Sequence, residues 1–255
     1  MFDNSSLVLA EDVDIRSVLP PEPKKDKKRP RQRPVSKVPA IVIRNIQPSL
    51  RKYIAVLEMA HKKDVNESDT SNIVNDILGD VLGFDKFFDV TTEYKIRGQY
   101  ADYGIRIKDK IHAFIEVKAI NIALNQNHLF QVASYAVHEG VDWAILTNGN
   151  VWQLYRIQDS KPIQNVLVTS VDLLDPNLKY SAKVNAFAPF HKRCLVGGCV
   201  EGLWREKSCV NSAALKGIIT SKKGLDFLKR ELRRASGYSV ETKRIEEMLH
   251  KEILK

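Results

Sequence analysis

Two acidic residues and a lysine are the residues whose types and spacing indicate chemistry. Asp102 lies in one short run of alternating apolar residues, and Glu116 and Lys118 lie two residues apart in the next. Carboxylate oxygens are ligands that Mg²⁺ and Mn²⁺ prefer. A lysine beside such a site can orient or deprotonate a water, or offset charge on a phosphate. The alternative is an ion-paired strand end, in which Lys118 offsets Glu116 and Asp102 is solvated.

The elements that must position these residues are three consecutive strands. Apolar and polar residues alternate over residues 87–96, 101–107 and 111–118, which predicts strands. A short polar turn centred on Asp109 joins the second and third strands. The three strands therefore form a meander in which neighbouring strands are antiparallel.

The register of this meander decides which side chains meet. A turn centred on Asp109 sets Asp102 opposite Glu116, provided that no bulge intervenes. Lys118 shares the face of Glu116, whereas Ile115 and Val117 point into the core. Two facing carboxylates repel each other unless a cation or a proton lies between them.

The rest of the middle region alternates between helical and extended patterns. Pro48 is predicted to open a helix over residues 48–61, with Leu50, Ile54, Leu57 and Met59 facing inward. The other predicted elements are helices over 68–82 and 124–139 and strands over 142–147, 151–157 and 163–171. This order predicts an α/β (α+β) domain.

The helix after the third strand carries a polar stripe. His128, Gln131, Tyr135 and His138 recur at helical spacing beside an apolar stripe. Gln131 and Tyr135 could reach the carboxylates or contact DNA, and a solvated helix face is the alternative.

Taken together, these motifs resemble one family. An Asp (Asp102), Glu-x-Lys (Glu116 to Lys118), Gln-x-x-x-Tyr (Gln131 to Tyr135) and Leu-Thr-Asn-Gly (146–149) before an aromatic strand follow in that order. The set resembles the nuclease domain at the N terminus of type I restriction enzyme R subunits, within the PD-(D/E)xK superfamily, over about residues 66–158. The resemblance implies a restriction-endonuclease-like core, with a central mixed sheet flanked by helices.

The resemblance also implies roles for individual residues. Asp102 and Glu116 match the metal-binding acids, which with the carbonyl of Val117 would hold Mg²⁺ or, as a substitute, Mn²⁺. Lys118 matches the catalytic lysine. Gln131 and Tyr135 match a motif that supports the site and the DNA backbone. The implied activity is DNA endonuclease cleavage.

The resemblance also implies a further acid at the metal site, on the helix that precedes the sheet. Glu67 is the best match for this metal-site acid, and Asp76 and Asp80 are rivals further along the same helix. A charge that the helix dipole favours at the helix start is the alternative for Glu67.

One departure from the family concerns ATP. The sequence contains no Gly-x-x-x-x-Gly-Lys-Ser/Thr motif, so we expect no ATP binding of that kind. The chain would be a free-standing nuclease or the nuclease part of a larger assembly. A catalytically silent nucleic-acid-binding module, or a subunit active only with a partner motor, is the alternative. A homodimer or a partner protein is possible in either case.

Composition and charge set the wider limits. The 255 residues are 44% hydrophobic with a net charge of +9, and we expect no membrane-spanning segment, no secretory signal and, with three cysteines, a cytoplasmic location. Residues 1–40 are predicted to be a disordered, basic, Pro-rich tail and residues 41–185 the nuclease-like domain. Residues 186–255 carry 15 Lys/Arg and 8 Asp/Glu and are predicted to be mainly helical.

The C-terminal segment contains two candidate sites. Its basic cluster is a candidate DNA grip, with a solvated helix face as the alternative; the cluster comprises Lys222, Lys223, Lys229, Arg230, Arg233 and Arg234. Four residues could ligate a structural zinc, but their spacing matches no strong zinc signature, so we expect buried thiols; they are His191, Cys194, Cys199 and Cys209.

Overall fold

A computed structural model describes residues 37–96, 98–160 and 163–254, and these residues form two units. The larger unit ends at Trp204 and the smaller begins at Arg205. Phe187, Phe190 and Leu195 belong to the main core, so the packing of the larger unit extends past residue 185. The tail predicted over residues 1–40 lies outside the described residues as far as residue 36.

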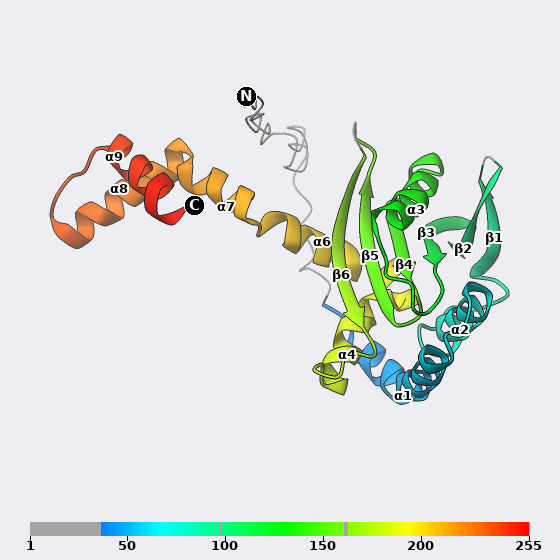
Figure 1. Ribbon diagram of the computed structural model, residues 1–255. Helices are drawn as coiled ribbons and strands as arrows, with labels where there is room; N and C mark the ends of the chain where they lie inside the picture. The colour runs from blue at the N-terminus through cyan, green and yellow to red at the C-terminus, as the bar shows by residue number, and fades with distance from the viewer. Residues whose placement is uncertain (1–36, 97, 161–162, 255) are drawn as a thin grey trace, which may run out of the picture. The chain divides into compact units, whose positions relative to one another are not determined.

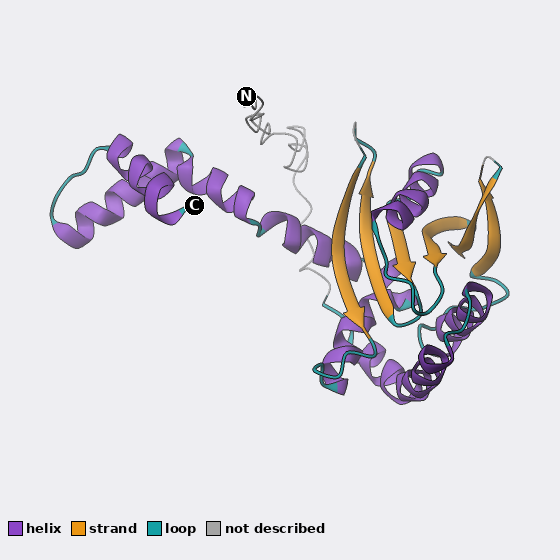
Figure 2. Ribbon diagram, in the orientation of Figure 1, coloured by secondary structure: helices purple, strands orange, loops and turns teal. Residues whose placement is uncertain are grey.

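The larger unit is built on one six-stranded sheet (Figures 1 and 2). Its strands lie in chain order: β1 (Val90–Ile96), β2 (Gln99–Ile107), β3 (Lys110–Val117), β4 (Trp143–Thr147), β5 (Val151–Gln158) and β6 (Gln164–Asp172). All neighbours are antiparallel except β3 and β4, which are parallel. The chain between those two strands contains helix α3, because parallel neighbours need a crossover.

Helices cover both faces of this sheet. The helices in chain order are α1 (Ala40–Lys63), α2 (Glu67–Asp80), α3 (Gln126–His138), α4 (Tyr180–Phe187), α5 (Lys192–Gly197), α6 (Cys199–Cys209), α7 (Ser212–Thr220), α8 (Lys222–Ser236) and α9 (Thr242–Met248). α3 packs on one face, whereas α1, α2 and α4 lie on the other (Figure 1). The mixed sheet between helices confirms the predicted α+β class.

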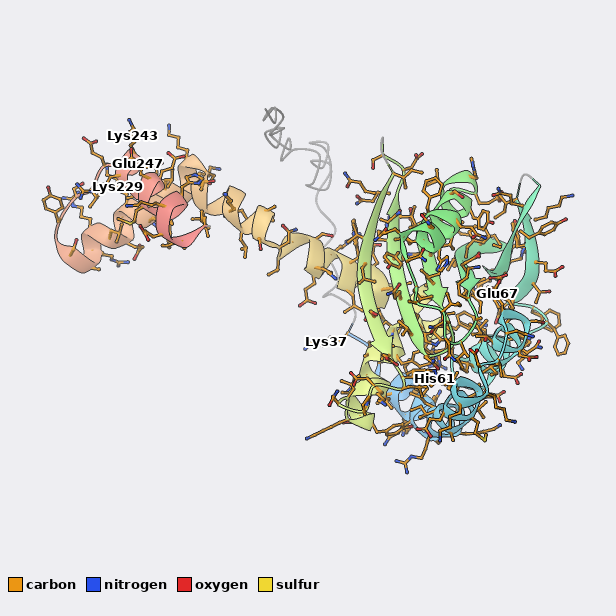
Figure 3. The ribbon with its side chains drawn as sticks, in the orientation of Figure 1. Lys37, His61, Glu67, Lys229, Lys243 and Glu247 are labelled. Carbon is orange, nitrogen blue, oxygen red and sulfur yellow. The ribbon has the colours of Figure 1, made fainter. Side chains whose placement is uncertain are left out.

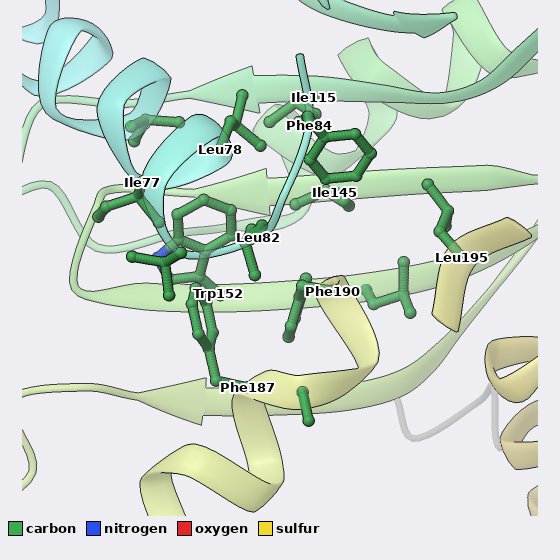
Figure 4. Packing of buried hydrophobic residues seen from close by; sticks show 14 of the residues in the cluster. Ile77, Leu78, Leu82, Phe84, Ile115, Ile145, Trp152, Phe187, Phe190 and Leu195 are labelled. Carbon is green, nitrogen blue, oxygen red and sulfur yellow. The ribbon is translucent and has the colours of Figure 1, made fainter. Parts of the chain in front are cut away.

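Alternating strand residues divide the apolar side chains between two cores. Tyr103, Ile115 and Val117 face α1 and α2, where Trp152 also packs against Phe187 (Figure 4). Residues of the opposite parity, such as Phe114 on β3 and Leu146 on β4, face α3. The β2–β3 face that carries Asp102 and Glu116 is therefore the face that α3 covers.

The predicted β2–β3 turn was wrong in length, although the register at the acids follows the prediction. The turn residues are Lys108 and Asp109, both with left-handed φ (49° and 62°), as a two-residue type I′ hairpin requires. The register shifts once between the turn and the acids, which leaves His112 as the extra residue on β3. Beyond this bulge Tyr103 pairs with Ile115, so Asp102 lies opposite Glu116.

α1 begins eight residues before the predicted start. The apolar repeat of Val42, Ile46 and Leu50 is buried through Pro48, which lies inside the helix rather than at its start. Pro48 is exposed, so water can solvate the carbonyl that its missing N–H leaves unbonded. The inward assignment of Met59 was also wrong, since that residue is 56% exposed.

The start of β1 also differs from the prediction. Phe87 and Phe88 lie in a turn, because the Asp85 carboxylate accepts hydrogen bonds from both of their backbone N–H groups (2.9 and 3.1 Å). β1 therefore begins at Val90 rather than at Phe87.

The smaller unit is helical and has a small core. Its α7, α8 and α9 are followed by a π-helical segment, Leu249–Ile253. Leu225, Ile245 and Leu249 are the buried residues of its core. Across residues 37–96, 98–160 and 163–254, no helix is both long enough and apolar enough to span a bilayer.

Candidate active site

The central feature of the larger unit is a pair of facing carboxylates on β2 and β3. Glu116 is only 1% exposed, and Asp102 opposite it is half-buried. The backbone N–H of Val117 donates a hydrogen bond to Asp102 Oδ2 (2.6 Å), which fixes that carboxylate against β3. The structure thus brings together the two acids that the sequence singled out.

Lys118 lies directly after β3, and its side chain joins this pair. Its backbone N–H donates to the carbonyl of Thr147 on β4 (2.8 Å). Its Nζ donates to Glu116 Oε1 (2.7 Å) and lies 3.6 Å from Glu67 Oε1. The ammonium group is therefore held between two carboxylates from different elements.

Glu67 is the helix acid that reaches this cluster. It is the first residue of α2, and Asn66 caps that helix by accepting a hydrogen bond from the N–H of Asp69 (2.9 Å). The rivals have other partners: Asp76 pairs with Lys86, and Asp80 accepts the hydroxyl of Tyr53. Figure 3 marks Glu67 at its position on α2.

The Gln-x-x-x-Tyr motif borders the same cluster from α3. Gln131 Nε2 donates to Tyr135 Oη (3.2 Å), one helical turn away. Tyr135 is buried, and burial is the main reason that its pKa is raised above 10; the charges of Glu116 and Asp102 add to the shift. The contribution of both acids to this pKa shift indicates that the Tyr135 hydroxyl lies within electrostatic range of Glu116 and Asp102.

Burial and repulsion together control the protonation of the acids. Burial, followed by the charge of Asp102, raises the pKa of Glu116 to about 7, and the contact with Lys118 only partly opposes this. Burial also raises the pKa of Asp102, despite the hydrogen bond from Val117 and the charge of Lys118. Lys118 keeps its proton, because its carboxylate neighbours outweigh the effect of burial and raise its pKa.

These residues fit a divalent cation. Glu116 Oε2 is buried and has no hydrogen-bond partner among the described residues, so an oxygen ligand is left unsatisfied there. The donors are hard carboxylate oxygens. In the part of the chain that the structure describes, no group of three or more His, Cys, Asp or Glu side chains is placed so that it could hold a metal ion. Mg²⁺ commonly uses one or two carboxylates and keeps several waters, so two acids suffice.

The turn between β4 and β5 has a positioning role that the sequence did not predict. Asn148 Nδ2 donates to the carbonyl of Ile122 (2.9 Å), and Asn150 Nδ2 donates to that of Ile120 (3.2 Å). These bonds hold the segment that follows Lys118 and leads into α3. Asn-Gly between two apolar runs is typical of a turn, but the hydrogen-bond partners of Asn148 and Asn150 are backbone carbonyls distant in the chain and carry no sequence signal.

His128 also lies near the acid cluster, and the sequence pattern assigned no role to this residue. Burial, and then the charge of Lys118, lowers its pKa, so the imidazole lies within electrostatic range of that lysine. Its Nε2 lies 3.4 Å from Asn125 Nδ2 at the start of α3. The first part of the predicted polar stripe therefore faces the acid cluster.

The C-terminal segment contains the other two candidate sites, the basic cluster and the His/Cys group, which share no residue with the acid cluster. All six predicted DNA-contacting residues, Lys222, Lys223, Lys229, Arg230, Arg233 and Arg234, lie on α8 in the smaller unit. Cys194 and Cys199 are buried as predicted, whereas Cys209 is exposed. His191 Nδ1 caps α5 by accepting the backbone N–H of Arg193 (3.1 Å).

A mixed sheet whose third strand ends in a buried Glu-x-Lys opposite an aspartate is suited to a nuclease-related protein. Residues 82–169 match the family model for the N terminus of type I restriction enzyme R proteins. The match suggests a nuclease-related role for this segment and implies an interaction with DNA. The matched segment contains Asp102, Glu116 and Lys118, whereas Glu67 and the smaller unit lie outside it. No curated protein and no solved structure matches the chain.

Proposed function

We propose that the protein is a metal-dependent endonuclease that hydrolyses phosphodiester bonds in DNA. The observation that carries the proposal is the buried carboxylate of Glu116, with one oxygen on Lys118 and the other unpartnered among the described residues. A structural ion pair needs no unsatisfied oxygen and no second acid opposite it. A cation site does need both, because the cation offsets the repulsion between the acids.

Each residue of the cluster has a distinct part in this proposal. The carboxylates of Asp102 and Glu116 and the carbonyl of Val117 hold Mg²⁺ or Mn²⁺. When bound, such an ion polarises the phosphate and lowers the pKa of a water. Lys118 offsets negative charge on the phosphate or orients the attacking water. Its position between Glu116 and Glu67 keeps the ammonium near the reacting group.

In this proposal the α3 residues support the active site, and the smaller unit binds the DNA backbone. Gln131 and Tyr135 orient each other beside the acids and can contact the DNA backbone. The basic residues of α8 bind phosphates, since residues 41–185 carry 16 Lys/Arg and 17 Asp/Glu and give little attraction of their own.

Cleavage assays with matched variants test the proposal. Supercoiled plasmid, single-stranded DNA and RNA are each incubated with Mg²⁺ or Mn²⁺ and with the wild type, Glu116→Gln or Asp109→Asn. Asp109 is an exposed turn residue with left-handed φ, which asparagine adopts readily, so that variant controls for loss of a carboxylate. We expect DNA cleavage by the wild type and by Asp109→Asn, and none by Glu116→Gln.

Two other outcomes identify the alternatives. Metal binding without cleavage, lost in Glu116→Gln, would indicate a subunit that cuts only with a partner motor. The absence of both metal binding and cleavage would contradict the catalytic proposal and leave a nucleic-acid-binding module.

A further inference from the structure

One side of α8 carries an aromatic residue within a row of cations. Lys223, Phe227, Arg230 and Arg234 recur at i, i+4, i+7 and i+11, which aligns them along one side of the helix. All four side chains are exposed, and Phe227 is 53% exposed. Figure 3 marks Lys229 on the same helix.

Phe227 is not part of the core of the smaller unit. The buried residue Leu225 and its partly buried neighbour Leu228 face Ile245 of α9, on the opposite side of α8 from Phe227. The guanidinium of Arg230 lies over the Phe227 ring, 5.3 Å from its centroid. An exposed aromatic ring that contacts a cation and has no packing role is available to a ligand.

We propose that this stripe binds single-stranded DNA, with an unstacked base on the ring of Phe227 and the flanking phosphates on Lys223, Arg230 and Arg234. A base of any identity can stack on an aromatic ring, and cations on either side follow the backbone. A duplex keeps its bases stacked on each other and offers only its phosphates to such a helix. This inference rests on the proposed function and specifies the form of DNA that the smaller unit binds.

The charges around Phe227 favour a nucleic acid over other occupants. An apolar protein surface or a lipid bilayer would need further apolar residues beside Phe227, but its neighbours along the stripe are cations, which are costly to bury unpaired. Two acidic residues of α8, Asp226 and Glu231, flank the stripe. The Glu231 carboxylate lies 3.4 Å from Arg230 Nε and 3.5 Å from Arg234, so these cations offset its charge.

Binding measurements that do not depend on cleavage test this proposal. The full chain carrying Glu116→Gln is titrated, without divalent metal, against a fluorescent single-stranded oligonucleotide, a duplex of the same length and a single-stranded RNA. Phe227→Ala, Phe227→Trp and the control Ile218→Ala are added to that background. Ile218 is an exposed apolar residue of α7 outside the stripe, so its loss tests for general effects of apolar exposure.

We expect Phe227→Ala to weaken single-strand binding about tenfold while duplex binding changes little, because a lost stacking contact affects only the unstacked strand. Phe227→Trp should retain the affinity, and its indole fluorescence should be quenched on binding the single strand. Ile218→Ala should bind like its parent. The RNA titration shows whether the sugar is also distinguished, and tighter binding of RNA than of DNA would overturn the choice of DNA.

Two further results would overturn the proposal. One is single-strand affinity that Phe227→Ala leaves unchanged, and the other is an equal loss for single strand and duplex. Failure of cleavage in the nuclease assays would leave this binding test intact, so the two proposals fail separately.

Discussion

The two units of this protein use charge in opposite ways. In the larger unit, Asp102, Glu116 and Lys118 are drawn into a sheet, where burial and mutual repulsion raise the pKa values of both acids. In the smaller unit, most charged residues of α8 are exposed and lie over a core with few buried residues. Burial fixes geometry and perturbs protonation, as catalysis requires, whereas exposed charge attracts a polyanion without fixed geometry.

This contrast also predicts how the charged residues of each unit affect folding stability. Placing an acid pair in a buried site opposes folding, so the larger unit should gain stability when the site is neutralised. The surface charges of the smaller unit cost little, and their removal should change binding rather than folding. Variants at the acid cluster should therefore leave DNA binding unchanged, and variants on α8 should leave folding stability and catalysis unchanged.

The largest expected effect is that of Lys118→Met on cleavage. Methionine keeps an unbranched apolar side chain but removes the ammonium that lies between Glu116 and Glu67, so cleavage should fall about 10²- to 10⁴-fold. Cleavage rates at saturating DNA and binding in EDTA measure the two properties separately. An equal loss of DNA affinity would show that catalysis and binding are not divided between the units.

The next effect concerns stability and pH, measured by urea unfolding in EDTA. Glu116 has a folded pKa of about 7, above its ordinary value of 4.5, so the folded state keeps a proton that the unfolded state loses as pH rises. Wild-type stability should therefore fall between pH 4.5 and pH 7. Glu116→Gln lacks that loss and should be more stable than the wild type by roughly 1–3 kcal/mol at pH 8.

At pH 4 the same pair should differ little, because Glu116 is then protonated in both states. A Glu116→Gln variant that is less stable than the wild type at pH 8 would mean that the carboxylate stabilises the fold, as a structural ion pair would. That result would also remove the basis for the contrast between the units.

The smallest of these effects is that of Arg233→Gln combined with Lys222→Gln on α8. Both side chains are exposed, so folding should be unchanged, while loss of two phosphate contacts should lower the salt slope of duplex binding by about 2. Titrations at several salt concentrations measure the slope. An unchanged slope would remove α8 from the DNA contacts, and an altered unfolding midpoint would show a structural role instead.

The sequence predicted most strands of the larger unit and the facing acids, because alternation and a polar turn are local signals. The type I′ turn and the bulge at His112 were missed, yet the two errors offset each other, and Asp102 still lies opposite Glu116. Pro48 misled because its helix-breaking tendency is local, whereas burial of Val42 and Ile46 by other elements decides the helix start.

Parts of the site could not be predicted, since they depend on residues distant in the chain. The motif pointed to Glu67, but only the packing of α2 against β3 brings it within 3.6 Å of Lys118. The bonds from Asn148 and Asn150 to the segment after Lys118 depend on the parallel pairing of β3 and β4. The exposure of Phe227 likewise follows from which side of α8 faces α9.

Calorimetric titration with Mn²⁺ at pH 7 tests the central claim most directly, because it needs neither substrate nor partner. With a Glu116 pKa of about 7, the wild type should bind Mn²⁺ and release about half a proton, measured by comparing buffers of different ionisation enthalpy. Glu116→Gln should show neither binding nor release, and Asp109→Asn should match the wild type. Equal Mn²⁺ affinity in the wild type and Glu116→Gln would contradict the account.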